Sequence, residues 1–143
     1  MNNFFKAFLF ACIGVTNEVV YTALTEFDYN NHLTWSLTGH TYVCMIVVYA
    51  LIPFFFDLLK EKIGQRPLLL RLFIYASLII IVEFIFGFIL DQLTGACPWD
   101  YTGKSKFEIM GYTRLDYFPL WMGFAFGCEW VLKKLDIDQT KKV

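Results

Sequence analysis

Two glutamates, Glu18 and Glu83, lie inside long apolar stretches of the sequence. A charged side chain in the core of a bilayer costs about 2.5 to 3.5 kcal/mol on insertion scales, so we expect both to face other helices or a polar cavity and not lipid. The functional interpretation is a proton-linked or cation-binding site that both carboxylates share. The structural alternative is a hydrogen bond from each carboxylate to a helix backbone or to a neighbouring polar side chain.

Aromatic and charged residues gather between the third and fourth apolar stretches, where Trp99, Asp100 and Tyr101 follow one another. Tryptophan and tyrosine favour the headgroup layer of a membrane. We expect Asp100 to accept backbone N–H groups and to fold this segment down as a lid, over either a substrate or lipid headgroup or simply over the helices. The candidate ligand or proton site therefore comprises Glu18, Glu83, Trp99, Asp100, Tyr101 and Arg114.

Four further charged residues stand near the opposite ends of the apolar stretches. Interfacial ion pairs that join the ends of neighbouring helices explain them without a ligand, although a carboxylate at a helix C-terminus is disfavoured by the helix dipole. We interpret these four as structural: Lys6, Asp57, Arg71 and Glu129.

Motifs for other chemistry are missing from the sequence. Residues 103–105 (GKS) resemble the end of a phosphate-binding loop, but Pro98 occupies the position of its first glycine. The histidines and the four cysteines lack the spacing of a metal site. The sequence therefore predicts no metal, no cofactor and no bound nucleotide, and a net charge of -1 without a basic cluster argues against nucleic acid. An intramembrane enzyme that uses the two glutamates as acid and base is the weakest alternative.

The composition requires a membrane to position these residues. Of the 143 residues, 57% are hydrophobic, 20% aromatic and only 17% charged, and the mean hydropathy is +0.51. A soluble domain of this size could not bury so much apolar surface. We therefore expect an all-α membrane protein with four transmembrane helices, at about residues 4–24, 38–59, 68–90 and 115–135.

The lysine and arginine distribution predicts the orientation, because these residues favour cytoplasmic connections. The first connection carries Glu26 and Asp28 without Lys or Arg, so both termini and the middle connection should be cytoplasmic, and Trp35 and Trp99 should lie on the opposite side. The basic residues of the middle connection and the C-terminal end are Lys60, Lys62, Arg66, Arg71, Lys133, Lys134, Lys141 and Lys142.

An internal repeat organises the chain. An offset of 65 residues aligns the first helix with the third, and an offset of 72 aligns the second with the fourth. Each half is then one hairpin, at about residues 4–62 and 67–135, followed by a short cytoplasmic tail at 136–143; two hairpins of the same orientation form a parallel repeat. The matched pairs include Lys6 with Arg71, Glu18 with Glu83, Tyr49 with Trp121, Asp57 with Glu129, and 39–41 (GHT) with 111–113 (GYT).

The sequence resembles the transmembrane protein 229 family, which is related to bacterial proteins labelled putative ABC-transporter type IV, or CmpB-like. The stretches that carry the resemblance are 66–71 (RPLLLR), 83–84 (EF), 87–90 (GFIL), 97–101 (CPWDY), Gly111, 116–117 (DY) and 119–121 (PLW). The resemblance implies a multi-pass membrane protein and names no substrate. Our leading hypothesis is a protein that binds or moves a small ligand or lipid through a central polar site. The alternative is an accessory subunit of a larger membrane assembly; membrane lipids are expected partners in both cases.

Overall fold

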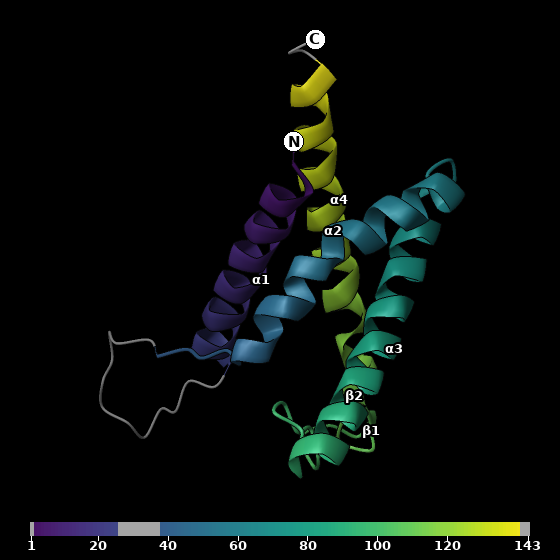
Figure 1. Cartoon of the computed structure of the whole chain (residues 1–143). Coiled ribbons are helices and arrows are strands. Elements are labelled where there is room, and N and C mark those ends of the chain that lie inside the picture. Colours follow the sequence, from purple (N-terminus) through teal and green to yellow (C-terminus); the bar gives the residue numbers. More distant parts are fainter. Residues whose placement is uncertain (1, 26–37, 141–143) are drawn as a thin grey trace. The chain divides into compact units, whose positions relative to one another are not determined.

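A computed structural model describes residues 2–25 and 38–140, with side chains up to residue 135. The described residues form four helices, α1 (Asn3–Thr25), α2 (Val43–Ile63), α3 (Leu68–Thr94) and α4 (Phe118–Thr140) (Figure 1). The chain divides into two compact units, which we call unit 1 (residues 1–59 and 138–143) and unit 2 (residues 60–137). The predicted positions of Glu26, Asp28 and Trp35 lie outside the described residues.

Three helices, α1, α2 and α3, are long and apolar enough to cross a membrane. At 1.5 Å per residue, the 21 residues of α2 extend about 32 Å, which matches a hydrocarbon core of about 30 Å. Large apolar side chains that remain exposed, such as Phe8, Phe55 and Ile81, suit contact with lipid. The protein is therefore an integral membrane protein.

Helix α4 does not meet the same criterion for a span, although the sequence predicts one there. Every stretch of 18 residues within α4 includes Glu129, Lys133 and Lys134, which makes the helix more charged than the other three. The helix also begins later than predicted, because residues Leu115–Tyr117 form a separate 3-10 turn, η1.

Unit 1 is held together by close approach of α1 and α2. Gly14 lies under the ring of Tyr49, so closely that a Cβ at position 14 would overlap the ring. Before the start of α2, Gly39 is packed in the same way against the backbone carbonyl of Val19. Phe10 is only 2% exposed and forms part of the core. Glycine at these positions therefore brings the second half of the unit against α1.

Unit 2 contains α3, most of α4 and the segment between them, which we call loop 95–117. Helix α3 ends at Gly95, whose left-handed backbone (φ 80°) lets its N–H bond the carbonyl of Asp91. The loop then forms a two-stranded antiparallel hairpin that lies by the end of α3, with β1 (Glu108–Ile109) paired to β2 (Thr113–Arg114) (Figure 1). The regular elements of the described residues are thus helices apart from this short hairpin, which the all-α prediction did not include.

Candidate functional site

The carboxylate of Glu83 is the centre of the polar contacts in unit 2. Tyr101 donates its O–H to Oε1 at 2.9 Å, and Thr113 donates its O–H to Oε2 at 2.5 Å. The indole N–H of Trp121 is buried and has no hydrogen-bond partner in the part of the chain that the structure describes. Each oxygen of Glu83 therefore has a neutral hydroxyl partner from loop 95–117.

Close packing of strand β2 and the C-terminal turns of α3 brings Tyr101 and Thr113 to the carboxylate of Glu83. Thr113 is 1% exposed because β2 packs on α3. At Gly87, one turn beyond Glu83, a Cβ would lie 3.0 Å from Tyr112 Cβ and 3.3 Å from Cys97 Sγ. The absence of a side chain at Gly87 thus lets the loop approach α3 closely enough for its hydroxyls to reach the carboxylate.

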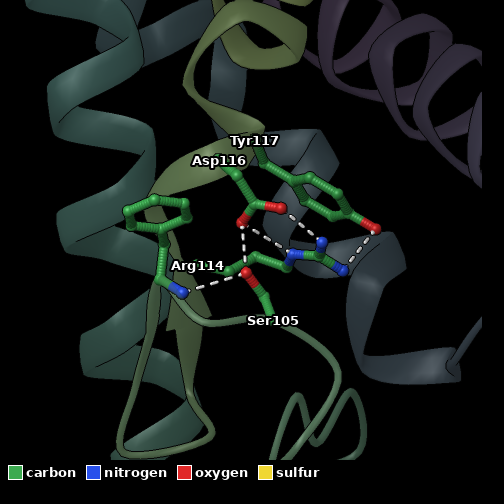
Figure 2. Close-up of polar contacts among 5 residues, drawn as sticks. Ser105, Arg114, Asp116 and Tyr117 are labelled. Carbon is green, nitrogen blue, oxygen red and sulfur yellow. Dashed lines mark hydrogen bonds and ion pairs between the residues drawn. The ribbon is translucent and has the colours of Figure 1, made fainter.

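Arg114 and Asp116 form an ion pair at the base of the same loop. Both guanidinium nitrogens that face Asp116 donate to its carboxylate, one at 2.9 Å, and Ser105 donates its hydroxyl to the same group at 2.9 Å. Figure 2 shows Asp116 between Arg114 and Ser105, with the ring of Tyr117 beside the guanidinium. We call these four residues the loop latch.

The loop latch also contacts the residue that caps Glu83. The guanidinium carbon of Arg114 lies 4.1 Å from the ring centroid of Tyr117 and 5.8 Å from that of Tyr101, within the range of cation–π attraction. The two tyrosine rings meet edge to face at 5.8 Å. Arg114 therefore helps to position Tyr101, while Asp116 neutralises the charge of Arg114.

Electrostatics outside the helices agree with this arrangement. The bonds from Arg114 lower the pKa of Asp116 to about 2, so this carboxyl is ionised at neutral pH. Burial, and then the adjacent Glu83 carboxylate, raises the pKa of Tyr101. The phenol of Tyr101 therefore stays protonated and can act as a donor.

Two predicted site residues, Trp99 and Asp100, form hydrogen bonds within loop 95–117 and not to Glu83. The indole N–H of Trp99 donates to the carbonyl of Tyr112 at 2.9 Å. Asp100 is exposed and accepts the backbone N–H of Thr102 at 2.9 Å and its hydroxyl at 2.6 Å, which lowers the pKa of Asp100. This turn sits over Gly111, where φ is 74° and a Cβ would lie 2.7 Å from the Asp100 carboxylate.

Glu18 belongs to unit 1 and has a hydrogen-bond partner there. Tyr49 donates its O–H to Oε2 of Glu18 at 2.8 Å. One turn later on α1, the hydroxyl of Thr22 accepts the N–H of His40 at 2.9 Å and donates to its carbonyl at 3.0 Å. A site that Glu18 and Glu83 share stays a prediction.

The charged residues at the other helix ends form one ion pair in each unit. In unit 1, Nζ of Lys6 lies 3.1 Å from the carboxylate of Asp57. In unit 2, a terminal guanidinium nitrogen of Arg71 lies 2.8 Å from the carboxylate of Glu129. The first pair joins α1 to α2, and the second joins α3 to α4. The predicted repeat aligns α1 with α3 and α2 with α4, so the two pairs occupy matching positions.

Four residues of the site were not among the predicted site residues, namely Ser105, Thr113, Asp116 and Tyr117. A signal for Thr113 exists in the sequence, because the match of 39–41 (GHT) to 111–113 (GYT) places a threonine at the end of both halves' connections. Spacing alone carried no signal for Asp116, whose partner depends on how the loop folds.

Comparison with known proteins identifies the family of this chain. No solved structure matches the chain. A family model described as putative ABC-transporter type IV matches residues 5–141, which is nearly the whole sequence and includes both units. The chain therefore belongs to the putative ABC-transporter type IV family of membrane proteins.

Proposed function

We propose that this protein is a transport-related membrane protein that binds a small ligand or lipid at Glu83, beneath loop 95–117. The observation that carries the proposal is the carboxylate itself. It lies within the apolar helix α3, yet its two donors, Tyr101 and Thr113, come from a loop and are uncharged. A charge held in a span without a cationic partner of its own is typical of substrate and ion pathways.

Two features support a loop that opens over this site. The donors to Glu83 are hydroxyls, which a ligand with its own donor groups can replace at equal hydrogen-bond count. The ion pair of the loop latch joins two residues of loop 95–117, Arg114 and Asp116, so the loop can move away from α3 without breaking this pair. In this proposal the ligand carries donor or cationic groups toward Glu83 and displaces Tyr101.

Native mass spectrometry of the purified protein in lipid nanodiscs tests the proposal. We expect the wild type to retain a bound lipid or small molecule that Glu83→Gln loses at equal protein yield. Glu61→Gln, which neutralises an exposed carboxylate at the end of α2, is the matched control and should retain it. Equal retention by Glu83→Gln would instead favour the accessory-subunit alternative, in which the carboxylate is structural.

We also propose that the chain is a duplicated hairpin, with repeats at about 4–62 and 67–135. The two ion pairs support this, because Lys6 with Asp57 and Arg71 with Glu129 occupy aligned positions. With the second hairpin oriented like the first, α4 is the fourth span. Both termini are then cytoplasmic, and the resemblance to the transmembrane protein 229 family reflects common descent.

A further inference from the structure

Unit 1 holds residues that align with Thr113 and Glu83, but it lacks the hydrogen bond between them among the described residues. The offsets of 65 and 72 residues carry Glu83 onto Glu18 and Thr113 onto Thr41. In unit 2 the threonine hydroxyl donates to the carboxylate at 2.5 Å. In unit 1 the hydroxyl oxygen of Thr41 is buried and finds no hydrogen-bond partner in the described part of the chain. The two units therefore differ in whether this hydroxyl is satisfied.

Thr41 lies between two contacts that hold its segment against α1. On one side, the backbone of His40 is bonded to the hydroxyl of Thr22, at 2.9 and 3.0 Å. On the other side, Tyr49 donates to Glu18 at 2.8 Å. Thr22 and Glu18 are four residues apart on α1 and so lie on one face of that helix. The segment that carries Thr41 therefore runs along the face of α1 that bears Glu18.

The chemistry of these groups selects a positively charged ligand. Among the described residues Glu18 is bonded by Tyr49 at Oε2, which leaves Oε1 as a further acceptor there. Thr41 adds a buried hydroxyl oxygen. Oxygen atoms of this kind bind hard cations or ammonium groups, whereas the negative charge of the carboxylate would repel an anion. A single carboxylate balances one positive charge, and a divalent ion would leave an excess charge within the span.

We infer that Glu18 and Thr41 bind a monovalent cation, either an alkali metal ion or an ammonium group, within unit 1. An unsatisfied buried hydroxyl is unfavourable, and a bound cation would remove that defect. This inference deepens the proposed function and rests on it in treating the intramembrane glutamates as ligand groups. It concerns a different residue pair from Glu83 and Thr113, so the two can fail separately.

The test is thermal unfolding of the full chain in phosphatidylcholine nanodiscs, in sodium, potassium, methylammonium or choline chloride at equal concentration. We expect a saturable rise in Tm with at least one small cation over choline, which is too bulky for the site. The metal and methylammonium arms distinguish the two kinds of ligand. Glu18→Gln should abolish the rise, and Thr41→Val should weaken the apparent affinity by about tenfold or more.

Matched variants in unit 2 serve as controls. Glu83→Gln and Thr113→Val should lower Tm but keep the cation-dependent rise. Thr41→Val is expected to fold, because it removes a hydroxyl that has no partner in the described residues and keeps the side-chain shape. The inference is wrong if no small cation raises the Tm of the wild type, or if Glu18→Gln keeps the full rise. A rise lost only in Glu83→Gln would overturn it while supporting the proposed function.

Discussion

At the scale of single residues, the chemistry of Glu83 follows from the kind of donor around it. Both of its partners, Tyr101 and Thr113, are neutral hydroxyls. The nearest guanidinium, that of Arg114, is committed to Asp116 and acts on Glu83 only at a distance. The carboxylate is therefore hydrogen-bonded but not neutralised, which leaves it able to take up a proton or a cationic group.

Removing the phenol oxygen of Tyr101 tests how much its bond to Glu83 stabilises the protein. A hydrogen bond to a charged group contributes about 1.5 to 3 kcal/mol, so Tyr101→Phe should lower the free energy of unfolding by that order while keeping the ring contact with Tyr117. Thermal unfolding in detergent measures the change. Tyr112→Phe removes the bond to Asp91 near the helix end, and a loss equal to that of Tyr101→Phe would contradict a special role for Glu83.

The loop latch predicts a response to acid. Because the pKa of Asp116 is lowered to about 2 in the folded loop, against about 3.9 for an ordinary aspartate, its contribution is complete above about pH 4 and is lost as the pH falls toward 2. Hydrogen exchange in residues 95–117, corrected for the intrinsic pH dependence, should accelerate across that window. Asp116→Asn should exchange rapidly at every pH, and an unchanged acid step in that variant would assign it to another group.

Sequence reasoning located Glu83, Tyr101 and Arg114, because charged and aromatic residues near a membrane are conspicuous. It also predicted that Asp100 accepts backbone N–H groups within this segment, and the N–H of Thr102 does donate to it. It did not predict that Trp99 donates to the carbonyl of Tyr112, since a side chain's partner depends on backbone turns. The turn at Met110, with φ of 53°, and Gly111, with φ of 74°, sets the hairpin that delivers Thr113. Strands of two residues are too short to show the alternation of apolar and polar residues that predicts a β-strand.

At the scale of elements, three apolar helices were predictable because a span of about 20 residues is the strongest pattern that a sequence contains. Their ends were less so. Helix α2 begins at Val43 and not near residue 38, and residues 115–117 form a separate turn before α4. These ends depend on local contacts such as Gly39 against Val19, which hydropathy does not report.

The contact between α1 and α2 predicts opposite effects of one substitution at two glycines. Glycine to alanine within a helix ordinarily stabilises by about 1 kcal/mol, and Gly123→Ala should follow this rule because a Cβ there meets nothing within 4 Å. Gly14→Ala should destabilise, by about 1 to 3 kcal/mol, because its methyl group overlaps the ring of Tyr49. Thermal unfolding of both variants measures the difference, and equal stabilisation would show that the helices are not in contact there.

At the scale of the whole molecule, family membership and composition agree on an integral membrane protein, and orientation is the next property to measure. The positive-inside rule predicts that loop 95–117 lies outside and that the connection between α2 and α3 lies in the cytoplasm. In a variant without native cysteines, an impermeant thiol reagent added to intact cells should label Thr102→Cys and spare Lys62→Cys. The reverse labelling pattern would invert the orientation.

The two ion pairs have a consequence for how this sequence can change during evolution. Replacing Arg71 alone leaves Glu129 as an uncompensated charge among apolar helices, and replacing Glu129 alone does the same to Arg71. A substitution at Arg71 or at Glu129 alone is therefore unfavourable, so we expect substitutions at these two positions to occur together. Arg71 is restricted further, because it also donates to the carbonyl of Arg66 at 2.7 Å. Exchanging the two residues would restore the ion pair but would leave the carbonyl of Arg66 without the donor from Arg71. We therefore expect covariation to keep the cation on α3 and the carboxylate on α4.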